Sequence, residues 1–237
     1  MKTIETFQRE KHSTIESKPT LEDKNNISSH IYDRIKSDIV ELRLEPGAYF
    51  LEKEIAEALG TSRTPVREAA KRLEQEGWIF WESYRKARVK DLTIESCQEI
   101  FQLRRMIEPF CIDCVFQQGK TRVLAGKLDY FVQEMDAQQQ DWYRFIHLDV
   151  RYHTTLVEEV GNAHLLRIWQ SLSSEITRIA IFARDEKRNT SHVIKEHKDL
   201  LQALWDMDRK KTMACLGSHY DSISRSLAER LEANAVR

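Results

Sequence analysis

The stretch LGTSRTPVREAAKRL, residues 59–73, decides the fold of the first part of this chain. Its apolar residues recur at helical spacing and predict a helix that buries one face: Val66, Ala69, Ala70 and Leu73. Thr61 or Ser62 can cap its start, the proline at 65 is tolerated in a first turn, and Gly77 is a stop signal. We therefore expect a helix that begins near Arg63.

Four polar side chains gather at the N-terminal end of this predicted helix: Ser62, Arg63, Thr64 and Arg67. A helix N-terminus presents unpaired backbone N–H groups and a partial positive charge, which together favour a phosphate. An arginine at such a tip can also donate two hydrogen bonds to a guanine edge in the major groove. The pattern alone leaves two interpretations open, a recognition helix for DNA and a basic surface helix of a small bundle.

The neighbouring segments complete the element order of a winged helix-turn-helix. Apolar positions in residues 27–44 predict a helix that ends at the EPG of 45–47, and LEKEIAEALG, residues 51–60, predicts a second short helix. Beyond the quoted stretch, WIFWES at 78–83 and KARVKDL at 86–92 predict two strands joined around YRK. We therefore expect three helices and a small β-hairpin.

Two further regions flank this winged helix-turn-helix domain, which is assigned to residues 27–92. Residues 1–26 are polar with little periodicity and are expected to form a flexible N-terminal tail. Residues 93–237 have the pattern of amphipathic helices almost throughout. Breaks between these helices are expected near Gly119, Gly161, 184–190 and 207–209. The expected fold class is mainly α, with an N-terminal winged helix-turn-helix followed by an all-α helical bundle.

Composition and charge narrow the function classes. The chain has 237 residues, is 41% hydrophobic and 32% charged, and carries a formal net charge of −1, so it can bury a core without being basic throughout. It has no apolar run long enough to span a bilayer, and its polar start is unlike a secretory signal, so we expect a cytoplasmic protein without a membrane partner. Residues 62–90 hold eight basic and four acidic side chains, and this local charge of +4 suits a nucleic-acid-binding domain as well as a solvated surface.

The most specific pattern is LRLEPGAYFLEKEIAEALGTSRTPVREAAKRLEQEGWI, residues 42–79, which resembles the DNA-binding domain of the GntR family of bacterial transcription regulators. The resemblance extends over about residues 28–90. An all-helical C-terminal domain behind it is similar to the FadR-like branch, whose effector domain is called FCD. The resemblance implies that 93–237 is an FCD-type effector-binding and dimerisation domain. It also implies a homodimeric repressor, not an enzyme, that binds a pseudo-palindromic operator in double-stranded DNA.

The resemblance further implies which side chains meet DNA: Lys53, Ser62, Arg63, Thr64 and Arg67. The lysine would contact phosphate, whereas the two arginines are the expected base-reading residues. At the wing, Tyr84 stands where relatives often have glycine, which puts the usual minor-groove contact in doubt. Arg85 and Lys86 would supply phosphate contacts there.

A second constellation lies in the C-terminal region. The stretch HLDVRYH places Asp149 and His153 one helical turn apart, close enough to bind one ion. His197 and His219 lie 11 residues before and after a predicted turn at Asp208, so in antiparallel helices both would lie about 16 Å from the turn and face each other. A lone helical histidine is more often a surface or core residue than a ligand. Three imidazoles and a carboxylate nevertheless suit Zn(II), Ni(II) or another first-row divalent ion.

The resemblance strengthens the metal interpretation. The pattern D...H, then EH..L..AL, then a histidine 22 residues later is similar to the metal-binding subset of FCD domains. The implied ligands are Asp149, His153, His197 and His219. The remaining histidines of this region match no such position and are interpreted as ordinary polar residues: His147, His164 and His192.

Two residues are candidates for binding an effector. Arg104, in FQLRRMIEPF, stands where the family's first effector-domain helix can face a ligand carboxylate, but it can equally pair with Glu108 one turn further on. Asn162, in GNAHLL, matches another recurrent position, although its residue type favours capping the next helix. The resemblance thus implies a small carboxylate effector, such as a sugar acid or another organic acid, bound by the metal and Arg104.

Two alternatives stay open from the residues alone. One is direct metal sensing, in which the ion itself is the effector. The other is a metal-dependent hydrolase fused to a winged helix, because a metal site with an open position can activate a water. No HExxH pattern supplies the general base that such a hydrolase needs. Cys111 and Cys114 form a CxxC pair within an apolar helical stretch, and we interpret them as core residues rather than a zinc or redox site.

Overall fold

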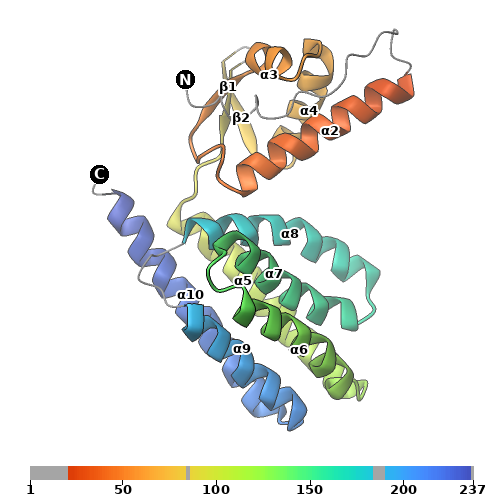
Figure 1. Cartoon of the computed structure of the whole chain (residues 1–237), viewed down its shortest axis with the longest axis vertical. Helices are drawn as coiled ribbons and strands as arrows, with labels where there is room; N and C mark the ends of the chain where they lie inside the picture. Colours follow the sequence, from red (N-terminus) through yellow and green to blue (C-terminus); the bar gives the residue numbers. More distant parts are fainter. Residues whose placement is uncertain (1–20, 84–85, 184–189, 236–237) are drawn as a thin grey trace. The chain divides into compact units, whose positions relative to one another are not determined.

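The computed structural model in Figure 1 describes residues 21–83, 86–183 and 190–235. The chain divides after Leu92 into two compact units. Both are mainly helical, and the one sheet found in the described residues belongs to the first unit, so the expected mainly α class is confirmed. Across these residues, every helix is too short or too polar to span a bilayer.

The first unit has the element order of a winged helix-turn-helix. Its elements are α2 (Leu21–Val40), β1 (Tyr49–Leu51), α3 (Glu52–Ala58), α4 (Arg63–Gln75), β2 (Ile79–Ser83) and β3 (Lys86–Val89). The strands form an antiparallel sheet in the order β1-β3-β2, with Phe50 opposite Ala87 and Ile79 opposite Val89. Helix α4 packs against α2, α3 and β2. This packing fixes the exposed tip of α4 on a rigid support.

The core of this unit explains why α4 forms where the sequence predicts it. The four apolar residues of its inner face are completely buried: Val66, Ala69, Ala70 and Leu73. They meet Ile35 and Ile39 of α2 in one hydrophobic core. Gly77, with φ of 78°, follows the end of α4 in the left-handed conformation that favours glycine. The helix is therefore fixed by burial on one side and by a glycine stop at its end.

Two features of this unit go beyond what the sequence predicts. Helix α2 begins at Leu21, so residues 21–26 belong to a helix and not to a flexible tail. The segment LEDKNN contains no proline or glycine, and its acidic residues favour a helix N-terminus. The rest of the expected tail, residues 1–20, lies outside the described residues. The expected hairpin of β2 and β3 is present, and β1 adds a third strand to it. A strand of three residues is too short to show an alternating pattern in the sequence.

The second unit is a bundle of α-helices. Its helices are α5 (Ile94–Gln117), α6 (Thr121–Ala137), α7 (Trp142–Glu159), α8 (Ala163–Phe182), α9 (Thr190–Trp205) and α10 (Arg209–Ala235). Helix α7 packs against α5, α6 and α8, and α10 packs against α5 and α9 (Figure 1). One break is missing from the sequence prediction, at residues 138–141, where the QQQD segment has no glycine or proline. Asp141 ends this break by accepting the N–H of Arg144 as the N-cap of α7.

The turn between α9 and α10 is where the sequence predicts it. Helix α9 ends at Trp205 and α10 begins at Arg209. Met207 adopts the left-handed conformation with φ of 55°, and the Asp208 side chain accepts the backbone N–H of Lys211 at the start of α10. The two helices pack against each other, which places the ring of His197 4.8 Å from the ring of His219 in an edge-on arrangement.

Candidate functional site

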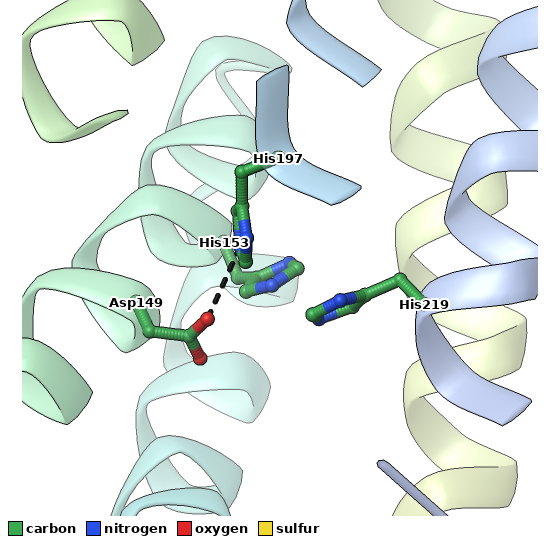
Figure 2. A group of neighbouring side chains, drawn as sticks. All are labelled: Asp149, His153, His197 and His219. Atoms are coloured by element: carbon green, nitrogen blue, oxygen red, sulfur yellow. Dashed lines mark ion pairs between the residues drawn. The ribbon is translucent and has the colours of Figure 1, made fainter. Parts of the chain in front are cut away.

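Three helices of the second unit contribute four buried side chains to one cluster. Asp149 and His153 come from α7, His197 from α9 and His219 from α10. Each offers one ligand atom, and these atoms all lie within 4.8 Å of one another. Figure 2 shows the carboxylate and the three imidazoles pointing toward a common centre. The structure therefore brings together all four residues that the sequence singled out as metal ligands.

The imidazoles are held in place through their Nδ1 atoms. His153 Nδ1 lies 2.5 Å from Glu108 Oε2, and His219 Nδ1 lies 3.0 Å from Glu196 Oε2. His197 Nδ1 lies 2.8 Å from the backbone oxygen of Val193. Carboxylate and carbonyl oxygens only accept hydrogen bonds, so each Nδ1 carries the proton and donates it. The Nε2 atoms of His153 and His219 are then left as acceptors that face the centre of the cluster, whereas His197 Nε2 faces the carboxylate of Asp149.

The Nε2 atoms of His153 and His219 have no hydrogen-bond partner among the described residues, although both are buried. His197 Nε2 lies 3.1 Å from Asp149 Oδ1, which is the ion-pair distance drawn in Figure 2. Buried polar atoms are rarely left without partners, because their desolvation is then uncompensated. Three nitrogen lone pairs and one carboxylate around a common point match the donor set of a divalent transition-metal site. Acceptors on Nδ1 complete the usual outer layer of such a site.

The electrostatic environment favours the metal-binding form at three of the four residues: His153, His219 and Asp149. Burial lowers the pKa of His219 well below its usual value and also lowers the pKa of His153, which keeps both imidazoles neutral. Burial opposes ionisation of Asp149, but His197 outweighs it and lowers the pKa of that carboxyl. Asp149 in turn raises the pKa of His197 against the effect of burial. Neutral imidazole and ionised carboxylate are the ligand forms that a divalent ion requires.

Arg104 lies next to this cluster and is almost completely buried in α5. Its Nε donates to Glu108 Oε1 at 2.8 Å, so the helical pair considered from the sequence is present. Burial raises the pKa of Glu108, but Arg104 and His153 outweigh it and hold that pKa at about 2. Arg104 Nη2 has no hydrogen-bond partner in the described part of the chain. Arg104 pairs with Glu108 through Nε, so its Nη2 is available to donate to a ligand.

A cavity connects Arg104 with the cluster. Its volume is about 30 Å³, and Arg104, Asp149 and His219 are among its lining residues. The free space holds a water molecule or a carboxylate-sized group. An anion in this cavity can therefore reach both Arg104 and the centre of the cluster.

The structure does not bring Asn162 to the cavity. Its side-chain oxygen accepts the backbone N–H groups of His164 and Leu165, so it is the N-cap of α8. Asn162 is exposed and is not among the lining residues. These contacts favour the alternative that the sequence also offered, in which Asn162 caps the start of α8.

Other candidates fall outside the cluster. His147 and His164 are exposed, and His192 Nε2 lies 3.2 Å from Glu196 Oε1. Cys111 is buried, and burial raises the pKa of its thiol to about 12, which is unfavourable for redox or metal chemistry. Sequence reasoning missed the role of Glu196, because only the packing of α9 on α10 places its carboxylate at His219.

The first unit presents a separate polar tip at the N-terminus of α4. Ser62, Arg63 and Thr64 are exposed there. Ser62 is the N-cap residue, and its side chain makes no capping hydrogen bond. The first backbone N–H groups of α4 therefore receive no capping bond from that side chain. A phosphate oxygen is a suitable acceptor for such groups.

Arg67 is placed differently from the expectation of a side chain free to read a base. Its Nε and Nη2 donate to the two carboxylate oxygens of Glu52, each at 3.0 Å. Glu52 is buried in α3, so this bidentate pair ties α3 to α4. The expected base contact of Arg67 would have to compete with this pair. Arg63 is exposed and takes no part in this pair, and its base contact stays a prediction.

The remaining basic candidates lie on the surface. Lys53 is exposed on α3, with its Nζ 3.5 Å from Glu57 Oε1. Lys86 begins β3, where its Nζ lies 3.4 Å from Glu82 Oε2 and over the ring of Tyr49. Arg85 lies outside the described residues. Exposed lysines of this kind suit contacts to phosphate rather than to base edges.

Comparisons with known proteins agree with this two-unit architecture. The chain is 25% identical over 199 residues to the gluconate operon transcriptional repressor of Bacillus licheniformis, which covers 80% of each chain. The solved structure of E. coli McbR/YncC superposes with a TM-score of 0.70 at 20% identity, over 86% of this chain and 98% of that one. A structure described as a metal-free FCD domain has a TM-score of 0.50 at 20% identity, over 60% of this chain and 98% of that one.

Two family models together account for most of the chain. The model for bacterial regulatory proteins of the gntR family matches residues 27–89, which contain the exposed tip of α4. The model for the FCD domain matches residues 99–222, which contain Arg104 and all four residues of the buried cluster. Regulators of this family bind DNA operators and are not enzymes. The chain therefore belongs to the GntR family of bacterial transcriptional regulators and carries an FCD domain behind its DNA-binding domain.

Proposed function

We propose that this regulator is a homodimeric repressor whose operator affinity is controlled by a small carboxylate. The carboxylate would bind to a divalent metal ion, Zn(II) or Ni(II), held by Asp149, His153, His197 and His219. One observation carries the proposal: three imidazoles and a carboxylate converge within 4.8 Å of one another beside Arg104, whose Nη2 has no hydrogen-bond partner within the described residues. A metal donor set and an anion donor thus lie beside one cavity, which is lined by Arg104, Asp149 and His219.

The protein's own residues have distinct parts in this proposal. Glu108 and Glu196 orient the imidazoles of His153 and His219 through Nδ1. Arg104 donates from Nη2 to one oxygen of the effector carboxylate and is itself held by Glu108. When bound, the ion supplies Lewis acidity and a fixed position for that carboxylate. The apolar surroundings exclude water, which strengthens each of these charged contacts.

DNA recognition would follow from the tip of α4. In a homodimer, two copies of this helix enter successive major grooves, so the operator is expected to be a pseudo-palindrome. An effector can change operator affinity only if it binds one arrangement of the dimer more tightly than the other. Filling a cavity of about 30 Å³ with a larger molecule displaces its lining helices, which provides such a difference.

The hydrolase alternative is not supported by the environment of the cluster. A hydrolase needs a general base beside the activated water. The two glutamates nearest the cluster, Glu108 and Glu196, are both engaged with imidazole Nδ1 atoms. The matching families and relatives are transcriptional regulators.

Titration of purified protein with organic acids tests the proposal. An operator fragment is first selected from random DNA, and its affinity is then measured with and without each acid. We expect at least one acid to change that affinity by about 5–150-fold, the usual range of coupling between two sites. No change with any acid would contradict an effector role. If EDTA alone switches DNA binding, the ion is the signal; if EDTA only abolishes the response to the acid, the metal anchors the ligand.

Substitutions at α3 and α4 test the DNA interface. Replacing Arg63 with alanine is expected to cost about 1–3 kcal/mol of operator binding and to relax preference at one base pair. Replacing Lys53 with alanine is expected to weaken all sequences alike and to reduce the slope of log K against log salt by about 1. Binding of single-base operator variants at several salt concentrations measures both effects. Lys71→Ala, an exposed change two turns along α4, is the matched control. Unchanged base preference in Arg63→Ala would remove Arg63 from base reading.

A further inference from the structure

The cavity beside the cluster has polar residues at one end and apolar residues elsewhere. Polar lining residues are confined to Arg104, Asp149 and His219, which all belong to the cluster and its immediate network. The rest of the lining is apolar or aromatic: Phe101, Trp142, Phe145, Ile146, Ile176, Ile179, Ala180, Ala183, Val193 and Ile223. A ligand anchored by its carboxylate at the polar end must therefore place the remainder of its body against hydrocarbon.

Helices α7 and α8 each contribute several apolar residues to this wall of the cavity. On α7, Phe145 and Ile146 precede Asp149 by one turn, so the helix changes from apolar to charged along the cavity. On α8, Ile176 and Ile179 lie one turn apart, Ala183 follows at the C-cap, and all three are buried. The apolar wall is thus a repeated feature of two helices and not a single side chain. On α7, the spacing of one helical turn fixes how far this wall lies from Asp149.

Hydroxyl groups on a ligand would find few partners in this wall. The unpartnered side-chain donors that the described lining offers are Arg104 Nη2, at the carboxylate end, and Trp142 Nε1. A buried hydroxyl without a partner weakens binding, whereas each buried methylene strengthens it about fourfold. A sugar acid carries a hydroxyl on nearly every carbon and would leave most of them unpaired. An acid with a hydrocarbon body meets no such penalty.

We infer that the effector is a carboxylate with an apolar body, such as a short-chain or branched fatty acid or its 2-hydroxy derivative, and not a polyhydroxylated sugar acid. This inference rests on the proposed function, because it assumes that a carboxylate occupies the metal and Arg104. It narrows the ligand class to molecules with one charged end and a hydrocarbon remainder. One acceptor on that remainder is accommodated by Trp142 Nε1.

A matched pair of acids tests the inference on the unmodified full-length protein loaded with Zn(II). Gluconate and 2-hydroxyhexanoate have the same number of carbons and the same 2-hydroxy acid head, so both chelate a metal alike. They differ in the hydroxyl groups along the chain. We expect isothermal titration calorimetry to give at least about tenfold tighter binding for 2-hydroxyhexanoate, because the additional hydroxyls of gluconate lack partners.

The possible outcomes test the apolar ligand class separately from the carboxylate effector itself. Equal affinities, or tighter binding of gluconate, would overturn the apolar ligand class while leaving a carboxylate effector in place. If neither these acids nor acetate nor oxalate binds the Zn(II)-loaded protein, the proposed carboxylate effector fails and this inference fails with it. Tighter binding of 2-hydroxyhexanoate supports both.

A substitution on α8 tests the position of the apolar body. Ala180 lines the cavity and is partly exposed, so a larger side chain is tolerated there more readily than at a fully buried position. In Ala180→Leu, the longest acids of the series from acetate to octanoate are expected to lose at least about tenfold in affinity, while acetate keeps its own. Ile168→Ala, an exposed change on the same helix, is the control and should leave the series unchanged. Equal loss for acetate and octanoate would contradict the placement of the chain against α8.

Discussion

Replacing His197 with alanine is expected to lower the affinity for Zn(II) or Ni(II) by more than about 100-fold. Loss of an outer partner of a ligand typically costs about 10–100-fold, and loss of the ligand itself must cost more. His197 lies between the other ligands, with its ring 4.8 Å from that of His219 and its Nε2 3.1 Å from Asp149 Oδ1. Elemental analysis of the purified variant and a competition titration with a chromophoric chelator measure the change.

His147→Ala is the matched control, because His147 lies on α7 with Asp149 and His153 but is exposed. It should retain the metal content and the affinity of the unchanged protein. Equal metal binding by His197→Ala and His147→Ala would show that the cluster does not hold the ion. Binding at an exposed histidine would then have to be considered.

Metal binding is also expected to raise the melting temperature of the protein. A metal that binds the folded state alone stabilises it by about 2.7 kcal/mol when its free concentration is 100 times its dissociation constant. For a unit of this size, that corresponds to a rise of roughly 5–10 °C in melting temperature. The rise should occur in the unchanged protein and in His147→Ala, and it should be absent in His197→Ala. Comparing each variant with and without metal removes the effect of lost packing.

The sequence was sufficient to predict the four residues of the cluster but not their support. Asp149 and His153 are recognisable because they lie one turn apart, and His197 and His219 because they are equidistant from a predicted turn. These are local relations that helix geometry converts into distance. Glu108 lies 45 residues before His153, and its contact with Nδ1 depends on how α5 packs against α7. No helical repeat encodes that packing.

In the DNA-binding domain, too, the sequence predicts local features but not the contacts between helices. Helix α4 is predictable because its apolar face, its N-terminal signals and Gly77 all agree. The pairing of Arg67 with Glu52 is not, because it depends on the angle between two short helices. The sequence alone does not distinguish Arg63 from Arg67 as a base-reading residue. The structure separates them, since it leaves Arg63 exposed and engages Arg67 in the pair.

The second large effect is expected at Glu108. Replacing Glu108 with glutamine keeps the side-chain volume but removes its charge, which leaves the buried guanidinium of Arg104 without a counter-ion. Breaking a buried ion pair in this way typically costs about 3–5 kcal/mol of unfolding free energy. The change also replaces the carboxylate that accepts from His153 Nδ1. We therefore expect, in addition, about 10–100-fold weaker metal binding. Chemical denaturation of the metal-free protein measures the first effect, and chelator competition measures the second.

Two comparison variants separate the roles of Glu108. Glu159→Gln also removes a buried carboxylate, but its partner Lys127 is 55% exposed, so a loss below about 1 kcal/mol is expected. In the double variant Glu108→Gln with Arg104→Met, no buried charge is left alone, and most of the lost stability should return. Metal affinity should not return, because His153 Nδ1 still lacks its carboxylate. Recovery of metal binding in the double variant would show that Glu108 acts on the cluster only by neutralising Arg104, and equal destabilisation by Glu108→Gln and Glu159→Gln would show that Arg104 does not depend on it.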